Sequence, residues 1–446
     1  MAHEELMILS WLKLVFIAFS AIVFVLNMVV LLWWRPRKIE NHFSRQGIRG
    51  PPYRFFIGNV KELVAMMLTA SSQPMPNFSH NIFPEFSLST TTGRKSMALI
   101  PVMAKSVVEM LDSWSAKLSD SGEVEIEVSE CFQTLTEEVI TRAAFGSSYE
   151  DGKAIFRLQT QQMVLASDAF QKVFVPGYRF LPTQRNIKSW KLDKEVRRSL
   201  VKLIERRKEE IVEKEHKDQK QEMKNNSYAK DLLGLMIEGS RSSSNMITAQ
   251  DIVEECKSFF FAGKQTTSNL LTWTTVLLAM HPQWQLSMVL NESLRLYPPT
   301  VATIRRAKTD VELGGYKIPR ETELLIPILA VHHDLATWGN DANEFNPARF
   351  ADGVARAAKH PVAFIPFGLG VRTCIGQNLA VLHAKLALAI ILQRFRFRLA
   401  PTYQHAPTVL MLLYPQHGAP IIFQPLDHDD DVANVDPTGP KEDQGQ

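Results

Sequence analysis

The chain has 446 residues, of which 45% are hydrophobic and 22% are charged, with a formal net charge of +3. This balance is close to the average of globular proteins, so it argues against a disordered chain and against nucleic-acid binding. Three cysteines, Cys131, Cys256 and Cys374, lie far apart in sequence, which argues against a disulfide framework and against a CxxC-type zinc site. We therefore expect a folded protein in a reducing compartment.

An uncharged apolar run, LVFIAFSAIVFVLNMVVLLWW, comes first, at residues 14–34. Its length is close to the roughly 20 residues that cross a bilayer as a helix, and it ends in two tryptophans followed by the basic sequence RPRK. A cleaved signal peptide is the alternative, but its apolar core is shorter and ends at small residues. The sequence predicts a membrane anchor over residues 1–34, with the following chain in the cytosol, and a basic, proline-rich linker over residues 35–52.

The main body is predicted at residues 53–424, where apolar residues recur mostly with helical spacing. In its first half, helices are expected at residues 102–118, 131–145, 154–174 and 192–214. The lysine-rich stretch 214–230 is predicted to be a solvated loop. The acidic tail at residues 425–446 contains few apolar residues and is predicted to be disordered.

A long helix is predicted over Ala249–Met280, and the sequence HP that follows ends it. Its middle, FFFAGKQTTSNLL, places Gly263 among bulky apolar residues, where glycine costs about 1 kcal/mol relative to alanine. Two explanations stay open, a close helix crossing that needs a small residue, or room for a ligand beside Ala262 and Gly263. In the second, the Thr266 hydroxyl bonds back to a carbonyl one turn earlier and widens the helix.

The next motif, NESLRLYPP, places Glu292 and Arg295 three residues apart, so that they share one face of a helix and can pair. Most such pairs are ordinary contacts. This pair precedes two prolines and lies upstream of the sequence FNPARF, in which Arg349 offers a second guanidinium to the same carboxylate. We therefore predict a buried carboxylate held by two arginines, as a structural lock near a bound cofactor.

The sequence FGLGVRTCIG contains Cys374 on a glycine-rich loop, directly before an apolar helix expected at residues 377–395. Backbone amides and the positive end of that helix favour a thiolate. A nucleophilic cysteine would need a base, and the loop contains no histidine, although folding could bring one. Arg372 supplies a cation for an acidic group, and three glycines allow a flat ligand to approach closely: Gly368, Gly370 and Gly376. Thiolate ligation of haem iron fits these features.

These motifs resemble those of the cytochrome P-450 family, in the family's order. FGLGVRTCIG resembles FxxGxRxCxG, ESLR the ExxR element, FNPARF the PERF-like segment and AGKQT the oxygen-activating helix. Segments such as GYRFLPTQRNIKSWKLDKE and YQHAPTVLMLLYPQHGAP are similar to plant enzymes of the 72 clan, particularly the brassinosteroid C-26 hydroxylases that inactivate the hormone. The resemblance covers about 400 residues. It implies a mainly α fold with small β-sheets, an N-terminal transmembrane helix, and a haem-thiolate catalytic domain at residues 53–424.

The resemblance also implies roles for the residues that fall on the family's motifs. Cys374 would be the proximal ligand of the iron of haem b, and Phe367 would shield its sulfur. The loop glycines 368, 370 and 376 would adjoin the cofactor, and Arg372 and Arg305 would meet its propionates. A structural triad would consist of Glu292, Arg295 and Arg349.

The catalytic residues implied by the resemblance lie in the middle of the long helix. Thr266 would deliver protons during oxygen activation, beside Gly263. Gln265 occupies a position that is often acidic in the family, so proton relay through a carboxylate is in doubt there.

Partners and localisation follow from the same resemblance. Electrons would come from NADPH through a separate membrane-bound reductase, because the chain has no flavin or nicotinamide fingerprint. The substrate would be a lipophilic steroid, hydroxylated to an alcohol, and the protein would be a single-pass protein of the endoplasmic reticulum membrane with a cytosolic catalytic domain. No nucleic-acid partner is expected.

Two departures from the family's pattern support an alternative prediction. HPQWQ, residues 281–285, runs directly into LSMVLNESLR, where relatives carry further helical residues. At residues 81–102, a short segment replaces a longer region that in the family contains strands, part of the substrate pocket and a WxxxR helix that contacts a propionate. Losing a buried cationic partner costs about 3–5 kcal/mol, of the order of a domain's net stability. The alternative is a catalytically impaired, haem-poor, membrane-anchored homologue.

A third reading is a haem isomerase that needs no reductase. It is disfavoured because Thr266 keeps the oxygen-activating position occupied.

Overall fold

The computed structural model describes residues 2–48, 100–172, 180–219, 231–242, 248–281, 286–409 and 412–426. The chain divides into two compact units. The N-terminal unit contains Met1–Ser72, Asp168–Asn186 and Ala307–Thr322, and the main unit contains the rest. Several predictions fall outside the described residues: the end of the linker, most of the segment 81–102, the loop after residue 219, the junction 282–285 and the acidic tail from residue 427.

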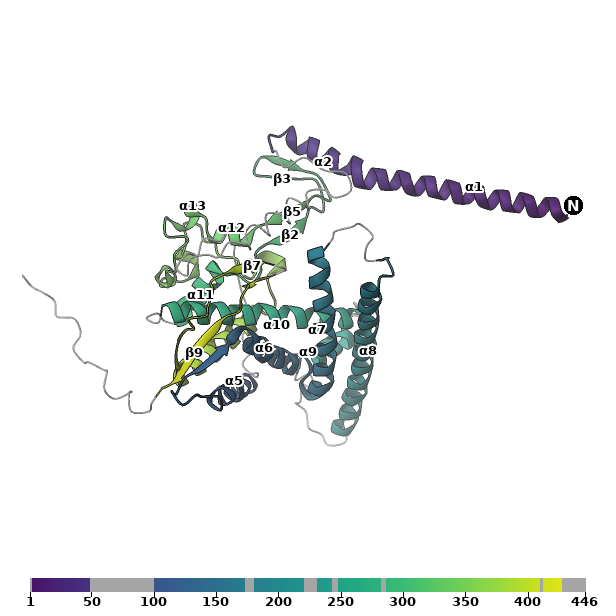
Figure 1. Cartoon of the computed structure of the whole chain (residues 1–446). Coiled ribbons are helices and arrows are strands. Elements are labelled where there is room, and N and C mark those ends of the chain that lie inside the picture. The colour runs from purple at the N-terminus through teal and green to yellow at the C-terminus, as the bar shows by residue number, and fades with distance from the viewer. Residues whose placement is uncertain are drawn as a thin grey trace, which may run out of the picture. The chain divides into compact units, whose positions relative to one another are not determined.

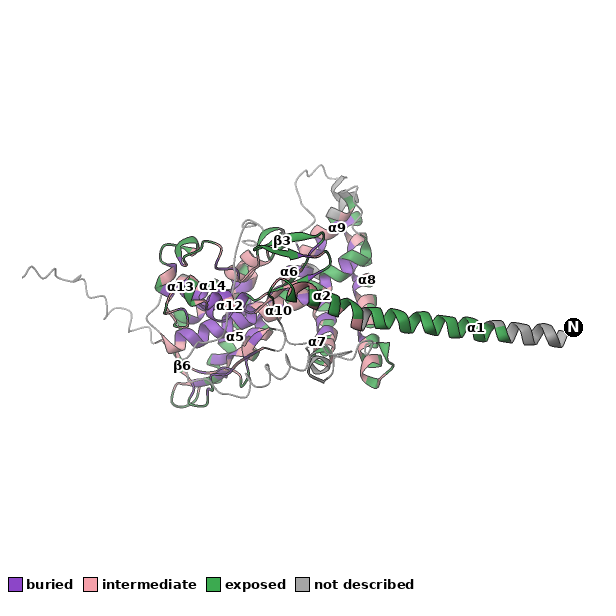
Figure 2. Cartoon of the chain, turned by 90° about the horizontal axis from the view of Figure 1, so that it is seen from above, coloured by how far each residue is buried: buried purple, intermediate pink, exposed green. Residues whose placement is uncertain are grey.

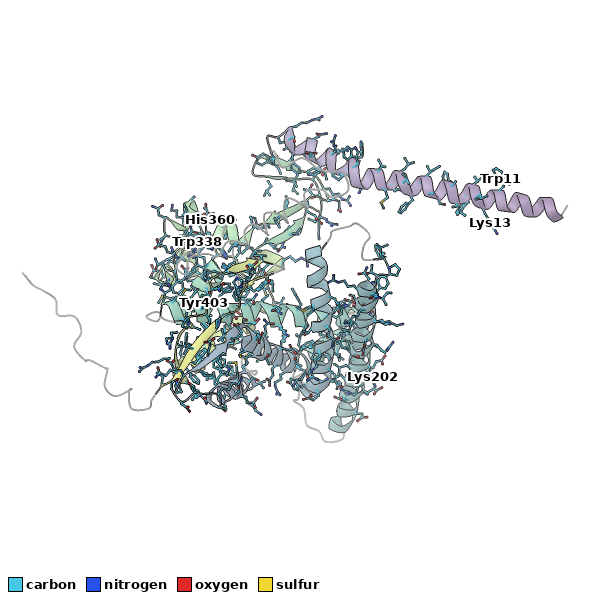
Figure 3. All side chains as sticks on the ribbon, viewed as in Figure 1. Trp11, Lys13, Lys202, Trp338, His360 and Tyr403 are labelled. Atoms are coloured by element: carbon cyan, nitrogen blue, oxygen red, sulfur yellow. The ribbon has the colours of Figure 1, made fainter. Side chains whose placement is uncertain are left out.

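The N-terminal unit begins with a continuous run of helix (Figure 1). Helix α1, Ala2–Val29, continues through the π-helix η1, Val30–Trp34, into α2, Arg35–Ser44. Along α1, apolar side chains are exposed, and Figure 3 shows Trp11 projecting outward from the helix. None of the helices in the described part of the chain combines the length and the apolar content that crossing a bilayer requires. The N-terminal anchor therefore stays a prediction.

A two-stranded hairpin completes the described part of this unit. Strands β3, Val311–Leu313, and β4, Tyr316–Ile318, pair antiparallel. Gly314 and Gly315, between them, both have a positive φ, which suits a tight hairpin turn. Side chains of helix α2 and the turn after it hold the backbone of β4, because Lys317 N donates to Gln46 Oε1 at 2.9 Å and Lys317 O contacts His42 Nε2 at 2.9 Å.

The main unit is built around the long helix α10, Ala249–Met280, whose bounds are those expected from the sequence. Thr248 caps its N-terminus in a reciprocal capping box with Asp251. Four helices surround the same apolar core: α5, Ile100–Ser115; α6, Val128–Phe145; α11, Leu286–Leu296; and α14, Gln377–Arg394. Figure 2 shows buried residues concentrated in this group, whereas the described part of α1 is exposed.

A second apolar cluster joins the other end of α10 to a group of three helices. These are α7, Tyr149–Lys172, with the short η2, Gly146–Ser148, before it; α8, Gln184–Gln219; and α9, Leu232–Ser242. In this cluster Phe156 of α7 lies with its ring centroid 4.2 Å from that of Phe260 of α10. Helix α8 extends beyond both ends of the predicted 192–214, because charged side chains such as Lys, Arg and Glu are also good helix formers.

The strands form small antiparallel sheets, as expected. Strands β1, Val124–Glu127, β9, Pro420–Pro425, and β6, Phe395–Leu399, form a sheet in the order β1-β9-β6. Strand β2, Thr303–Arg306, pairs with β5, Glu323–Ile326, and β7, Pro407–Val409, pairs with β8, Leu413–Pro415. Short helical turns fill the connection from β5 to α14: α12, Ile328–His332; α13, Leu335–Trp338; η4, Pro347–Phe350; η5, Val354–Arg356; and η6, Gly370–Arg372. The architecture is mainly α with small sheets.

Candidate active site

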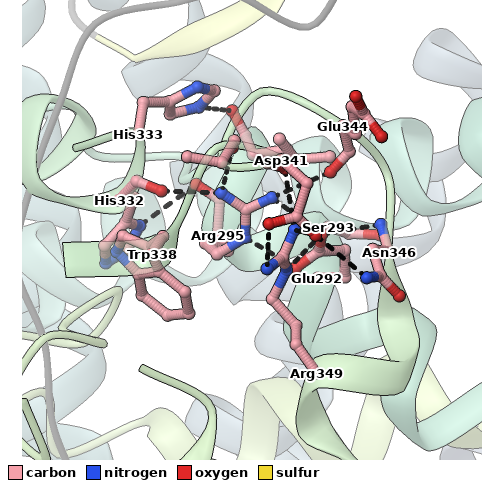
Figure 4. Close-up of polar contacts among 12 residues, drawn as sticks. Glu292, Ser293, Arg295, His332, His333, Trp338, Asp341, Glu344, Asn346 and Arg349 are labelled. Atoms are coloured by element: carbon pink, nitrogen blue, oxygen red, sulfur yellow. Dashed lines mark hydrogen bonds and ion pairs between the residues drawn. The ribbon is translucent and has the colours of Figure 1, made fainter. Parts of the chain in front are cut away.

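Glu292 and Arg295 lie on α11 and are both fully buried. Arg295 donates to both carboxylate oxygens of Glu292, from Nε at 2.6 Å and from Nη2 at 2.7 Å. Its remaining N–H groups donate to the carbonyl oxygens of His332, Ala342 and Glu344 (Figure 4). All five donors of the guanidinium are therefore used, which compensates for its loss of hydration.

Arg349, on η4, supplies the second guanidinium. Its Nε donates to Glu292 Oε1 at 3.2 Å, and its Nη2 lies 2.9 Å from Asp341 Oδ2. Burial alone would raise the pKa of the Asp341 carboxyl, but hydrogen bonds from Asn346 and Arg349 outweigh it and lower that pKa. The backbone N–H of Asn346 also donates to Glu292 Oε1, at 2.9 Å. The structure thus brings the three predicted triad residues together and adds Asp341, which the sequence interpretation did not include.

His332 connects this network to the segment that leads to the cysteine loop. Its Nδ1 lies 3.1 Å from Arg295 O, and Ile365 N donates to its Nε2 at 3.0 Å. Since Nε2 accepts, Nδ1 carries the proton and donates to Arg295 O. The sequence interpretation missed His332, although a histidine pair inside the apolar run ILAVHHD was a signal that polar groups are buried there.

The cysteine loop is closed by a backbone bond from Cys374 N to Phe367 O at 2.8 Å. Cys374 is exposed, whereas Cys256 is buried and Cys131 lies between these extremes. Partial burial of the sulfur raises the pKa of the Cys374 thiol, and the amides of Gly376 and Gln377, which point at it, lower that pKa by less. The expectation that the loop by itself favours a thiolate is therefore wrong in direction. Desolvation outweighs the amides, so a thiolate here needs a bound cation.

The loop is open at one glycine and carries exposed apolar side chains, features that a flat macrocycle with a central metal would need. Gly368 and Gly370 have φ values of +75° and +69°, which side chains rarely adopt. A Cβ at Gly370 would meet no atom within 4 Å, so the space above it is open. Ile375 is 79% exposed and Leu369 is 47% exposed, although both are apolar. One accessible sulfur beside exposed apolar side chains fits the donor and the apolar face that haem needs.

The surroundings of Gly263 on α10 decide between the two explanations for this glycine. A Cβ at Gly263 would lie 2.6 Å from a side-chain atom of Ile140 on α6, so this glycine is needed for a close helix crossing. The expectation that Gly263 leaves room for a ligand is therefore corrected. Ala262, by contrast, is exposed in the middle of a largely buried helix, and Thr266 Oγ1 donates to its carbonyl at 2.5 Å. The predicted bond back to the preceding turn is present.

The remaining predicted site residues make few contacts with one another. Arg305, on β2, donates to the Thr303 hydroxyl at 2.6 Å and to Ile304 O at 2.9 Å, both within its own strand. Arg372, at the end of η6, is exposed and makes no ion pair within the described ranges. Among the described residues, Arg305 and Arg372, the two arginines predicted to meet the propionates, do not contact each other. Gln265 is half-buried.

Comparison with known proteins gives a family match over most of the chain. The model of the family described as Cytochrome P-450 matches residues 84–287 and 285–422. Cytochrome P-450 734A1 of Arabidopsis thaliana is 58% identical over 502 aligned positions, covering 90% of this chain and 94% of that protein. Cytochrome P-450 734A6 of Oryza sativa subsp. japonica is 50% identical and covers 89% of this chain and 93% of that protein. A chain of 446 residues cannot fill 502 aligned positions, so part of the Arabidopsis protein has no counterpart here.

Solved structures support the same fold. The structure described as retinoic acid bound cyanobacterial CYP120A1 has a TM-score of 0.61 and 21% identity, over 75% of this chain and 76% of that chain. The haem domain of cytochrome P450DA has a TM-score of 0.58 and 21% identity, over 73% of each chain. The comparisons show that this chain lacks part of a relative's length, but they do not show that it is impaired.

Proposed function

Because this chain belongs to the cytochrome P-450 family, and is therefore a monooxygenase of the oxidoreductase class, we propose that it hydroxylates the side chain of a brassinosteroid at C-26 and thereby inactivates the hormone. The observation that carries the proposal is the position of Cys374. Among the three cysteines it alone is exposed, on a glycine loop directly before α14. The segment similarity to brassinosteroid C-26 hydroxylases supports the substrate class.

Cys374 would hold the iron of haem b, and Phe367 and the loop glycines 368, 370 and 376 would lie against the macrocycle. When bound, haem supplies the chemistry that activates dioxygen and inserts one oxygen atom into a C–H bond. A bound iron offsets the desolvation that raises the pKa of the thiol, so binding and deprotonation of Cys374 are coupled. Arg372, which has no ion pair in the described residues, would neutralise one propionate, and Arg305 would have to leave Thr303 to reach the other.

Thr266 would hold and pass protons at the open side of α10. Its hydroxyl donates to Ala262 O, which leaves the oxygen lone pairs available to accept a hydrogen bond from water. Gln265 cannot donate an acidic proton, so the proton supply runs through the Thr266 hydroxyl and solvent. The Glu292–Arg295–Arg349 triad would not touch substrate; it holds α11 and the segment before the loop through His332.

Electrons would come from NADPH through a membrane-bound reductase, which is typical of this family. We propose that the protein is held at the endoplasmic reticulum membrane by residues 1–34, with the catalytic domain in the cytosol. The exposed apolar side chains along α1 and the cations of Arg37 and Lys38 beside the rings of Trp33 and Trp34 support contact with a lipid surface. A lipophilic steroid would reach the site from that surface.

The test is to express the chain with a plant reductase and measure haem per protein, the carbon monoxide difference spectrum, and brassinosteroid product with and without NADPH. We expect a thiolate band and a hydroxylated product that requires both NADPH and reductase. Thr266→Ala should keep the band but lower the product formed per NADPH consumed, because proton delivery and not haem binding is lost. Absence of the thiolate band in the parent chain would overturn the proposal.

A second protein, in which the two shortened segments are lengthened to match the family, is expressed in parallel. Comparing it with this chain distinguishes an active hydroxylase from the haem-poor alternative. Equal haem content and equal turnover in the two versions would show that the missing segments are dispensable. Much higher haem content in the lengthened version would favour the alternative.

A further inference from the structure

Lys264 is a charged residue in the middle of α10 and is only 7% exposed. Its ammonium group pairs with the carboxylate of Glu137 on α6, and lies 5.5 Å from the centroid of the Phe260 ring. On α6, the hydroxyl of Thr136 lies 2.9 Å from Lys264 O and 2.8 Å from Phe132 O of its own helix, so these two carbonyl oxygens share its single proton. Helix α6 therefore holds both the side chain and the backbone of one α10 residue. These contacts of Glu137 and Thr136 with Lys264 are called the α6 brace.

The α6 brace lies behind the turn that carries Thr266. Successive residues of a helix are about 100° apart, so Lys264 lies on the side of α10 opposite Thr266, whereas Ala262 and Thr266, four residues apart, share a face. The contacts agree with this geometry, because Gly263 lies against Ile140 of α6 while Ala262 is exposed. The α6 brace thus holds one side of this turn of α10, at Lys264, and Thr266 lies on the opposite side of the same turn.

Side-chain hydroxyls bond to backbone carbonyls in this turn, as they also do further along α10 at Thr272, Thr274 and Thr275. Thr266 donates to Ala262 O, and Ser268 donates to Gln265 O at 3.1 Å, in addition to the bond from Thr136 to Lys264 O. Hydroxyls that bond to helix carbonyls compete with the backbone amides and tend to bend the helix. A bent or loosened turn places its side chains accurately only if something outside the helix holds it.

A buried ion pair is a poor choice for stability alone. Lys264 loses most of its hydration, while the Glu137 side chain stays 22% exposed, and well-packed apolar residues in the place of such a pair are often neutral or stabilising. An ion pair between two helices does, however, fix their register, because any slip leaves both charges unpaired. The Glu137–Lys264 pair is of this kind, since its members are far apart in sequence and on different helices.

We propose that the α6 brace positions Thr266 for proton delivery, with Lys264 and Glu137 as positioning residues. The inference rests on the proposed function for the role of Thr266. Because Gln265 supplies no acidic group, proton delivery depends on where the Thr266 hydroxyl lies. The brace sets that position without contacting substrate or cofactor.

The test compares two double variants. Glu137→Gln with Lys264→Met removes the brace without leaving an unpaired charge. Glu138→Gln with Arg142→Met is the matched control, because this pair, 2.8 Å apart, lies within α6 one residue further on and is partly exposed. Thr136→Val is a milder third variant that removes the hydroxyl contact with Lys264 O, together with the contacts of the same hydroxyl with carbonyl oxygens inside α6.

The first measurement is amide hydrogen exchange across α10, which needs no cofactor. We expect exchange at residues 261–266 to rise about tenfold in the brace variant, with little change at residues 271–278 and in the control. A merely stabilising pair would raise exchange along the whole helix. Unchanged exchange at residues 261–266, or a uniform rise, would overturn the proposal.

The second measurement is product formed per NADPH consumed in the haem-loaded protein with reductase. Since a small misplacement of a reacting group costs about 10- to 100-fold, we expect this ratio to fall by at least tenfold in the brace variant while KM changes little. Lys264→Arg, which keeps the charge, should restore most of the ratio. An unchanged ratio in the brace variant contradicts the proposal. If the parent chain shows no thiolate band, the proposed function fails instead, and the exchange measurement still decides whether the brace holds this turn.

Discussion

The Glu292–Arg295–Arg349 network and the Cys374 loop lie on the same unit, but they differ in how many of their polar groups the protein itself satisfies. Each N–H group of Arg295 has a partner, and neither Arg295 nor Glu292 is exposed. In the loop, Cys374 and Arg372 are exposed, and Ile375 is 79% exposed. The network is complete as a scaffold, whereas the loop is completed only by what binds to it. Substitutions in the first should change folding, and substitutions in the second should change binding.

The largest expected effect is in the network. Arg295→Met leaves the buried Glu292 with only Arg349 and the backbone N–H of Asn346, and removes the donor to the carbonyl oxygens of His332, Ala342 and Glu344. Breaking a buried pair from one side costs about 3–5 kcal/mol, so we expect urea unfolding to show a loss of that size and much of the protein to be insoluble. Arg306→Met is the control, since Arg306 forms an exposed pair with Glu323 at 2.6 Å, for which about 0–1 kcal/mol is expected. Equal losses in the two variants would contradict the comparison.

The second prediction concerns the cysteine loop, where a substitution should change the thiolate band and leave the free energy of unfolding nearly unchanged. Cys374→Ala removes the proposed iron ligand, so the thiolate band should disappear completely, while the free energy of unfolding of the cofactor-free protein changes little because the residue is exposed. Cys256→Ala should do the opposite. Cys256 is 2% exposed and burial raises the pKa of its thiol to about 12, so it is an inert core residue whose truncation costs stability but not the band. Loss of the band in Cys256→Ala or Cys131→Ala would show that the wrong cysteine was assigned.

Sequence patterns were sufficient where local signals decide the structure. The bounds of α10 follow from the capping residue Thr248 at one end and the HP sequence at the other. The pairing of Glu292 with Arg295 follows from helical spacing, and Thr266 bonds back by one turn as its type and position suggest. These contacts join residues that are close in sequence.

Sequence patterns failed where the partner is distant or where burial sets the energy. The side chain that Gly263 accommodates, Ile140, lies on α6, and no local pattern identifies it. His332 joins Arg295 to Ile365 through residues more than thirty positions apart. The direction of the Cys374 pKa depends on how much protein surrounds the sulfur, which a glycine-rich motif does not encode.

The third prediction concerns the loss of folding stability in acid through two buried histidines. Burial lowers the pKa of His333, beside the network, and of His383, on α14, to about 4 in each case. Below pH 6.5 the unfolded chain binds protons that these buried rings do not, so the stability that each ring contributes falls by about 1.4 kcal/mol per pH unit from about pH 6.5 to about pH 4, where the contribution of the rings levels off.

His383→Leu tests this pH dependence directly. Nε2 of His383 has no hydrogen-bond partner among the described residues, so the substitution removes a titrating group without breaking a bond there. Urea unfolding between pH 7 and pH 4.5 should show a slope smaller by about one proton than in the parent. An identical slope would mean that His383 is protonated in the folded protein.

The smallest effect separates two glycines of the cysteine loop. Gly370 has a φ of +69° and a Cβ there would meet nothing within 4 Å, so Gly370→Ala adds conformational strain but no clash. Strain of this kind costs about 1–2 kcal/mol, which urea unfolding of the cofactor-free protein can measure. Gly376 has a φ of −87°, and a Cβ there would lie 3.8 Å from the Cys374 sulfur, an ordinary contact. Gly376→Ala should therefore leave stability unchanged but shift the thiolate band, because its methyl group lies beside the iron ligand. If Gly376→Ala lowers stability as much as Gly370→Ala and leaves the band in place, the loop is a structural turn and its glycines do not serve the cofactor.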